Sequence, residues 1–200
     1  MNTFQETLSF TDKMRKPAHK IIAKAFGIGF QSITRVQSLR DLALDQRAGI
    51  DSLVIFEPSK VNYTLQEKYR TFDKLKFKDF TQELYNAYQT EYQSDGEFLH
   101  LHATYYFYGW CNEAETDFAE WFIMNIPTYK QLVLQAGGLA KIPGAKAIQN
   151  NAYGKALFYS MPLEFLKPAI EDNSQGLDHI FKIVHTKEKN LHGGQVLSCL

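Results

Sequence analysis

The chain has 200 residues, enough for one domain with a sizeable core, and its composition is that of an ordinary globular protein. Its 22 basic residues equal its 22 acidic ones, so the overall charge gives no support to nucleic-acid binding, although a local basic patch would suffice. The N-terminal residues lack the basic start and long apolar run of a signal peptide, and no stretch approaches the roughly 20 apolar residues that span a bilayer. We therefore expect a soluble cytoplasmic protein without membrane contact, as one domain over residues 1–200.

The first 27 residues are predicted to be helical in two segments. Residues 1–16 form the earlier segment, and Pro17 breaks or kinks the helix because proline lacks a backbone N–H. Apolar residues recur at helical spacing over 18–26, and Gly27 suits the stop that follows them. A helix is therefore expected before the strands.

Two of the strands that follow are predicted to form a hairpin. Residues 51–56 read as a buried strand, 57–60 have the composition of a turn, and 61–70 form the next strand. A short strand over 31–37 comes before them. Strands joined by so short a turn are expected to pair as antiparallel neighbours.

The second half of the chain alternates between further strands and helices. Residues 79–88 are ambiguous between the two, and 141–155 have the composition of a loop. Strands are predicted over 103–110, 118–126 and 156–160, and helices over 127–136, which stops at Gly137, and over 162–170. Helices before and after a central group of strands predict a sheet covered by helices, an α/β or α+β layered domain.

The strand over 61–70 separates two kinds of side chain, because alternate residues of a strand point to opposite faces. One face is almost wholly polar and consists of Asn62, Thr64, Gln66, Lys68 and Arg70. The other face is mostly apolar and is expected to pack on the core, with Glu67 on it. Asp51 begins the neighbouring strand, so the hairpin brings its carboxylate close to Gln66 and Lys68.

A carboxylate, an amide oxygen and an ammonium group in this arrangement suit phosphodiester hydrolysis. A hard divalent cation takes oxygen ligands, and Mg²⁺ usually takes only one or two from the protein. The cation polarises the phosphate and lowers the pKa of a bound water. A neighbouring lysine can orient or deprotonate that water, or stabilise the developing charge.

The segments Gly49-Ile50-Asp51 and Thr64-Leu65-Gln66-Glu67-Lys68-Tyr69-Arg70 resemble the core of the PD-(D/E)XK nuclease superfamily. In that family an Asp begins one strand of a hairpin, and an acidic residue and a Lys two positions later lie on the next strand. The resemblance covers roughly residues 10–90. Ile50 stands in place of the proline, and Gln66 replaces the second acid, which makes this the Gln-x-Lys variant that resembles Mrr-like restriction enzymes.

The resemblance implies a restriction-endonuclease-like α/β fold, with a mixed central β-sheet flanked by helices. It also implies a Mg²⁺-dependent endonuclease, with Mn²⁺ as an alternative metal, that cuts double-stranded DNA. Asp51 and Gln66 would hold the metal and Lys68 would assist the attacking water. An acid of the first helix would complete the catalytic set, Glu6 before Asp12. A homodimer follows by analogy alone.

Several basic residues near this motif are expected to contact nucleic acid. Arg70 would lie next to the phosphate, and Lys60, Lys74 and Lys76 belong to a stretch in which basic residues outnumber acidic ones. Asp79 and Glu83 could reach the edge of the site if their segment is a strand.

Three alternatives remain open at this point. The polar face of 61–70 could be the solvated face of an edge strand, with Asp51 capping a turn. The fold could instead serve a non-catalytic binding or assembly module, which the neutral Gln66 and the zero net charge favour. His100 and His102 could bind zinc if they lay on a strand, but no third ligand is evident.

Overall fold

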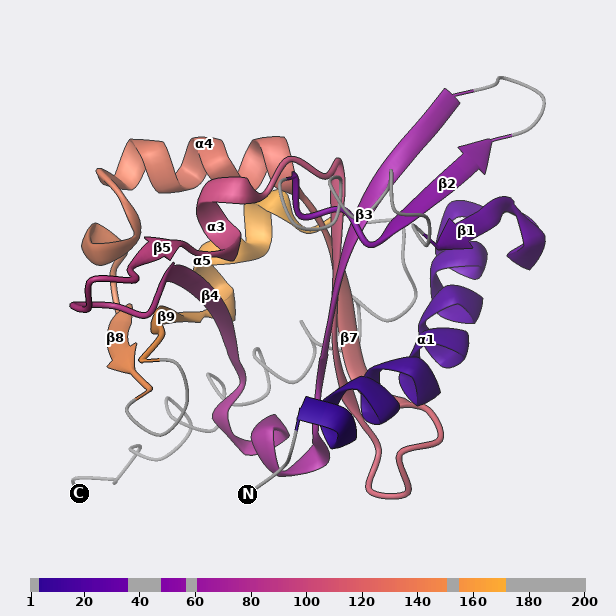
Figure 1. The fold of residues 1–200 in the computed structure, drawn as a ribbon. Coiled ribbons are helices and arrows are strands. Elements are labelled where there is room, and N and C mark those ends of the chain that lie inside the picture. Colours follow the sequence, from indigo (N-terminus) through magenta and orange to yellow (C-terminus); the bar gives the residue numbers. More distant parts are fainter. Residues whose placement is uncertain (1–3, 36–47, 57–60, 151–154, 172–200) are drawn as a thin grey trace, which may run out of the picture.

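A five-stranded mixed sheet lies at the centre of the computed structural model, which describes residues 4–35, 48–56, 61–150 and 155–171 (Figure 1). In spatial order its strands are β1 (Ile33–Arg35), β2 (Ser52–Phe56), β3 (Val61–Arg70), β6 (Tyr105–Cys111) and β7 (Phe118–Asn125). Neighbouring strands are antiparallel except β3 and β6, which are parallel. The predicted mixed central sheet is therefore confirmed.

The predicted hairpin is formed by β2 and β3. Ser52 lies opposite Leu65 and Val54 opposite Tyr63, and the residues of the connecting turn, 57–60, lie outside the described part of the structure. β3 also pairs with β6 on its other side. β2 borders residues 61–65 of β3 and β6 borders residues 65–70, so Gln66, Lys68 and Arg70 have a paired strand on one side only among the described residues. Their side chains are half-buried, so the interpretation of this face as a solvated one is wrong.

Helix α1 (Phe4–Phe26) covers one face of this sheet and runs without interruption through Pro17. Of the two outcomes predicted at Pro17, a break or a kink, the break is wrong, and Figure 1 shows the continuous helix bending along its length. Met14, Ala18 and Ile22 are fully buried on both sides of the proline, so packing against the sheet holds the two halves together. The predicted stop is confirmed, because Gly27 adopts a φ of +64° and the chain leaves the helix there.

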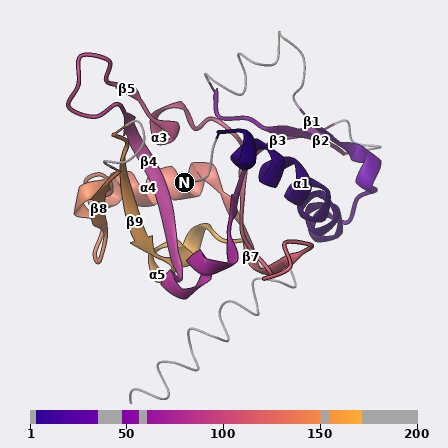
Figure 2. The same cartoon turned by 60° about the horizontal axis from the view of Figure 1, so that its bottom comes forward.

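A second sheet lies on the other side of the central one, as the two views in Figures 1 and 2 agree. Its strands in spatial order are β5 (Ser94–Asp95), β4 (Asp79–Asn86), β9 (Leu157–Pro162) and β8 (Lys146–Gln149). β4 resolves the ambiguous segment 79–88 as a strand. β8 falls in the segment predicted as a loop, and its four residues are all exposed, so it lacks the apolar alternation by which a strand is detected.

Short helices connect and cover the second sheet. They are α3 (Glu97–His100), α4 (Ile126–Ala136) and α5 (Leu163–Leu166), with 3-10 turns at Phe30–Ser32, Phe72–Phe77, Leu139–Lys141 and Lys167–Ala169. The predicted helix over 127–136 is confirmed: the Asn125 side chain caps its start by accepting from the Thr128 N–H, and Gly137 ends it. Among the described helices, none is long and apolar enough to cross a membrane.

Two apolar cores lie on the two faces of the central sheet. Alternation along β6 sends Phe107 towards α1, while Tyr106 and Tyr108 point towards the second sheet. The core between the sheets is the larger of the two, and Phe80 of β4 lies within it. The polar face of β3 is on the same side as this larger core, where Gln66, Lys68 and Arg70 are half-buried, whereas Asn62 is exposed.

Candidate functional site

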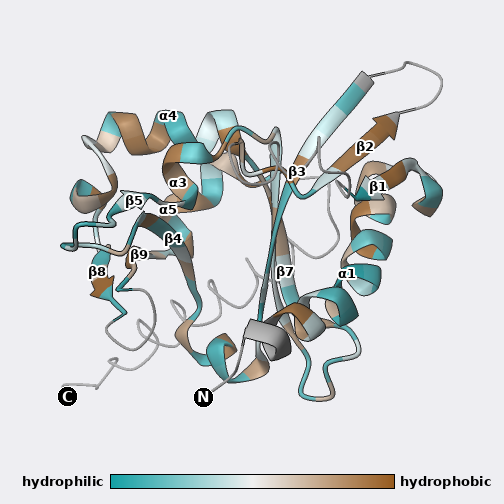
Figure 3. Cartoon of the chain, in the orientation of Figure 1, coloured by the Kyte–Doolittle hydropathy of each residue, from teal (hydrophilic) through white to brown (hydrophobic). Residues whose placement is uncertain are grey.

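The polar side chains of β3 from Thr64 to Arg70 are partly buried rather than solvated, although Figure 3 shows the strand largely in hydrophilic colours at the centre of the molecule. Lys68 Nζ donates to the Thr81 carbonyl oxygen at 3.3 Å and to Glu97 Oε2 at 3.0 Å. Arg70 donates to the Thr81 hydroxyl and, at 3.0 Å, to the Tyr108 hydroxyl. The second sheet and α3 therefore supply hydrogen-bond partners for this face.

Asp51 enters the site from the start of β2. Its backbone N–H donates to the Leu65 carbonyl oxygen at 2.7 Å, and its Oδ2 accepts from the Glu67 N–H at 2.7 Å. The next residue, Ser52, points to the α1 side of the sheet, where its hydroxyl donates to Glu67. Alternation extended one residue back from β2 puts Asp51 on the face of Gln66 and Lys68, while its observed side-chain hydrogen bond is with the backbone N–H of Glu67.

The side-chain oxygen of Gln66 is the second feature of the site. Its Oε1 atom is buried and has no hydrogen-bond partner among the described residues. Gly49, at a φ of +55°, runs close by, and a Cβ at that position would lie 3.3 Å from this oxygen. A buried polar atom without a partner is costly, so an oxygen left in this state is a candidate ligand atom.

A polar cavity of about 450 Å³ opens beside Gln66. The residues that line it include Glu83 and Asn86 of β4, and Glu97 and His100 of α3. Burial is the main cause that raises the pKa of Glu83, with Glu97 raising it further and Lys68 lowering it. The prediction that Glu83 could reach the edge of the site is consistent with this position. Asp79 lies at the other end of β4 and accepts from the Ser160 hydroxyl at 2.5 Å.

Glu97 is a site residue that sequence reasoning missed. Its Oε2 binds Lys68, and its Oε1 accepts from the Tyr106 hydroxyl. Burial by itself would lower the pKa of Lys68, but the negative charge of Glu97 raises it overall, so Lys68 keeps its charge. The pKa of Tyr106 lies well above its usual value, first because of burial and then because of Glu97 and Asp51. The Glu97 and Asp51 carboxylates therefore both raise the pKa of the Tyr106 hydroxyl.

The local sequence around Glu97 explains why α3 can reach the site. Gly96 donates its N–H to the Leu84 carbonyl oxygen at 2.8 Å, which ties the start of the helix to β4. A Cβ on Gly96 would lie 2.7 Å from the Leu84 carbonyl carbon and 2.9 Å from the Tyr85 nitrogen. The absence of a side chain at Gly96 therefore lets the two backbones approach.

We expect Gly96→Ala to lower the free energy of unfolding by about 1–3 kcal/mol, because the added methyl group meets backbone atoms that cannot rotate away. Urea denaturation followed by tryptophan fluorescence would measure the loss. Ala87→Gly, at a position with a φ of +45°, gives a control in the same sheet region that removes a methyl group instead. A Gly96→Ala variant as stable as the parent protein would contradict the proposed close approach.

The opposite face of β3 holds a second polar cluster, around Glu67. His19 Nε2 of α1 lies 3.1 Å from Glu67 Oε1, and the Ser52 and Tyr69 hydroxyls both donate to this carboxylate. Burial would raise the pKa of Glu67, but the interactions with His19 and the two hydroxyls lower it overall. Glu67 thus points away from Gln66, as strand alternation predicts, while its backbone N–H holds Asp51.

The acids predicted on the first helix do not have a described place in the site. Glu6 belongs to α1, but its side chain lies outside the described part of the structure. Asp12, the second choice, accepts from Arg15 at 2.5 Å and from Arg35 at 3.2 Å. Helix α1 packs on the Glu67 face of the sheet, so Asp12 is separated from Lys68 by the sheet itself.

The predicted nucleic-acid contacts are spread over different surroundings. Lys60 lies outside the described residues. Lys74 pairs with Asp73 at 2.9 Å, and Lys76 lies 5.1 Å from the centre of the Phe77 ring; both belong to the turn that follows β3. Arg70 is occupied by the hydrogen bonds to Thr81 and Tyr108 described above. Their contact with nucleic acid stays a prediction.

The histidine pair does not have the geometry that zinc binding would need. His100 is the last residue of α3 and His102 follows the helix, so no strand aligns the two rings. In the part of the chain that the structure describes, no set of three or more His, Cys, Asp or Glu side chains is gathered to hold a metal ion. A cation site here would therefore have to combine fewer carboxylates with other oxygens, as Mg²⁺ sites do.

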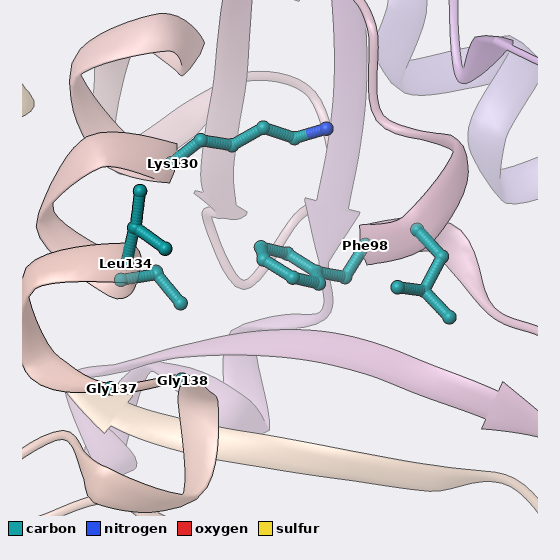
Figure 4. A pocket seen from close by; sticks show the side chains of 7 residues that line it. Phe98, Lys130, Leu134, Gly137 and Gly138 are labelled. Carbon is teal, nitrogen blue, oxygen red and sulfur yellow. The ribbon is translucent and has the colours of Figure 1, made fainter.

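A second pocket, of about 520 Å³, lies between α3 and α4 (Figure 4). Phe98 faces Leu134 across it, and Lys130 extends above with its Nζ 5.8 Å from the centre of the Phe98 ring. Burial lowers the pKa of Lys130. The pocket is lined by none of the predicted site residues, so we keep it separate from the candidate site.

Comparisons with known proteins gave no sequence match and a distant structural one. No protein-family model matches the sequence, and no curated protein matches it significantly. Among solved structures, the chain is similar to the restriction endonuclease MspI, crystallised in complex with its cognate DNA, with 10% sequence identity and a TM-score of 0.36. The match covers 78% of this chain and 82% of that chain. A likeness of this size carries no argument for activity, so function has to be inferred from the site itself.

Proposed function

We propose that the protein is a metal-dependent endodeoxyribonuclease with a restriction-endonuclease-like fold. The observation that supports it most is the buried, unpartnered Gln66 Oε1, on the strand face that also carries the charged Lys68 and, by alternation, Asp51. In the nuclease superfamily that the sequence resembles, an Asp begins one hairpin strand and a Lys lies on the next, and the β2–β3 hairpin has both residues.

The oxygens present fit a hard divalent cation, Mg²⁺ or Mn²⁺. Asp51 would contribute the anionic ligand and Gln66 the neutral one, and the unpartnered Gln66 Oε1 is the atom that a cation would satisfy. A bound divalent cation would supply polarisation of the phosphate and a bound water of lowered pKa.

Lys68 would act as a charge and not as a base. Glu97 raises its pKa, so the ammonium group keeps its proton near neutral pH. A protonated lysine can orient the attacking water and stabilise negative charge that develops on the phosphate, but it cannot accept the proton of that water. While Lys68 is paired with Glu97, the electrostatic role is therefore favoured over that of a base.

The substrate we propose is double-stranded DNA, as the family resemblance implies. Lys74 and Lys76, beyond the end of β3, have side chains near the surface and could contact the backbone phosphates. Arg70 is the weaker candidate, because two hydrogen bonds already direct its guanidinium group between the sheets. A homodimer remains part of the proposal by analogy.

Plasmid cleavage tests the proposal directly. We expect the protein to nick or linearise supercoiled DNA with Mg²⁺ or Mn²⁺, and Asp51→Ala and Lys68→Ala to slow cleavage at least about 100-fold, the scale on which loss of one charge-stabilising group acts. Glu113→Ala removes an exposed carboxylate far along the chain and serves as the control. Equal cleavage by the parent protein and both site variants would refute the assignment.

A non-catalytic binding or assembly module is the second candidate. The ion pair between Lys68 and Glu97 favours such a module, because it neutralises the charge of the lysine. Gln66 is neutral, so the face of the β2–β3 hairpin that carries Gln66 and Lys68 (the hairpin face) has one carboxylate among its described residues, that of Asp51. Titration with Mn²⁺ in a calorimeter separates the two functions. A catalytic site should bind the cation in a way that depends on Asp51, whereas a module of this kind should not bind it.

A further inference from the structure

We propose that Glu97 supplies the cation site with the carboxylate that Gln66 does not provide, and that Lys68 occupies this carboxylate when no cation is bound. This inference rests on the proposed function and deepens it. It assigns the second acid of the site to α3, in place of Glu6 or another residue of α1.

The hairpin face is short of negative charge. Asp51 is its only carboxylate among the described residues from 48 to 56 and 61 to 70 that share this face, since Glu67 points to α1. One of the Asp51 oxygens already accepts from the Glu67 N–H. Mg²⁺ is bound through one or two carboxylates, and a site with a neutral amide as its other ligand gains most from a second one.

Glu97 is held where that second carboxylate is needed. Its side chain lines the cavity beside the unpartnered Gln66 oxygen, and it reaches Lys68 at 3.0 Å. The Tyr106 hydroxyl donates to its other oxygen, and Gly96 fixes the start of α3 against β4. The carboxylate is therefore oriented before any ligand arrives, which reduces the entropy lost on binding.

The ion pair between Lys68 and Glu97 explains how both partly buried charges are compensated when no cation is bound. The Glu97 side chain is 17% exposed and the Lys68 side chain 29% exposed, so each charge has lost much of its water and needs a partner. A divalent cation at the Gln66 oxygen would compete with the ammonium group for the same carboxylate. Lys68 would then be released towards the substrate phosphate, where the proposed function requires it.

This exchange predicts opposite effects for the two members of the pair. Removing Glu97 should weaken cation binding, because a ligand is lost. Removing Lys68 should strengthen it, because the competing charge is lost and the carboxylate becomes free. A purely structural ion pair would show neither effect on cation affinity, although it would show losses of stability in both variants.

Calorimetric titration of the full chain with Mn²⁺ provides the test. We expect Glu97→Gln to weaken binding about 10- to 100-fold, as altered groups around metal sites do, and Lys68→Met to tighten it about fivefold or more, the lower range of coupling between sites. Glu91→Gln removes an exposed carboxylate from the connection between β4 and β5 and should leave the affinity unchanged. Melting temperatures without metal confirm that each variant is folded.

The outcomes separate this inference from the function on which it rests. Absence of Mn²⁺ binding by the parent protein would overturn both. Binding that is lost in Asp51→Ala but unchanged in Glu97→Gln would overturn the role of Glu97 and leave the nuclease proposal standing. Binding by Lys68→Met that is not tighter than that of the parent would overturn the exchange, and an unfolded variant could not produce the expected gain.

Discussion

Phe80→Ala is expected to lower the free energy of unfolding by about 3–5 kcal/mol, the usual cost of emptying a buried aromatic site. The Phe80 side chain is 0% exposed and joins the two sheets. Its ring packs edge to face against four rings, those of Tyr106, Tyr108, Phe122 and Tyr129, at centroid distances of 5.4, 5.1, 6.0 and 5.5 Å. Neighbours on several elements would have to move together to fill the space, so the cavity should persist.

Urea denaturation followed by fluorescence would measure this loss. Phe77→Ala offers a matched control three residues earlier, because Phe77 is 56% exposed and its removal should change stability by less than about 0.5 kcal/mol. Similar losses in the two variants would show that Phe80 does not hold the sheets together.

Glu67→Ala is expected to cost a similar amount, about 3–5 kcal/mol, because it breaks a buried charged cluster by removing one member. The Glu67 side chain is 3% exposed, and His19, Ser52 and Tyr69 would all lose their shared partner. Glu67→Leu, which fills the space, should recover part of the loss, since an apolar replacement leaves less empty volume.

Two comparisons would check the Glu67 prediction. Glu113→Ala, at an exposed position, should leave stability within about 0.5 kcal/mol of the parent. His19→Ala combined with Glu67→Ala should cost less than the sum of the single changes, because both remove the same contact. Additive losses would mean that His19 and Glu67 do not interact in the folded protein.

Much of the central sheet could be predicted because its signals are local. Alternation along residues 61–70 separates Gln66 and Lys68 from Glu67, and the structure has the same separation. The bounds of β3 agree with the predicted strand, and Gly27 and Gly137 end their helices as expected. These features depend on residues only a few positions apart.

The partner of Lys68 could not be predicted, since it depends on tertiary packing. Glu97 lies 29 positions beyond Lys68, in the four-residue helix α3, and no spacing rule connects the two. The burial of the polar face of β3 could not be predicted for the same reason, because Thr81 lies on β4, in the segment whose sequence is ambiguous between strand and helix. Pro17 does not end the helix, because packing of α1 outweighs the local tendency of proline to break it.

The parallel pairing of β3 with β6 has a consequence for the order in which the molecule assembles. Leu65 pairs with Tyr105, and the whole of β4, β5 and α3 lies in the chain between them. Contacts between residues so distant in sequence close large loops and slow folding. The β2–β3 hairpin can form early, whereas Tyr106 joins Glu97 only after β6 has docked. We expect the candidate site to be among the last parts of the protein to acquire its final geometry.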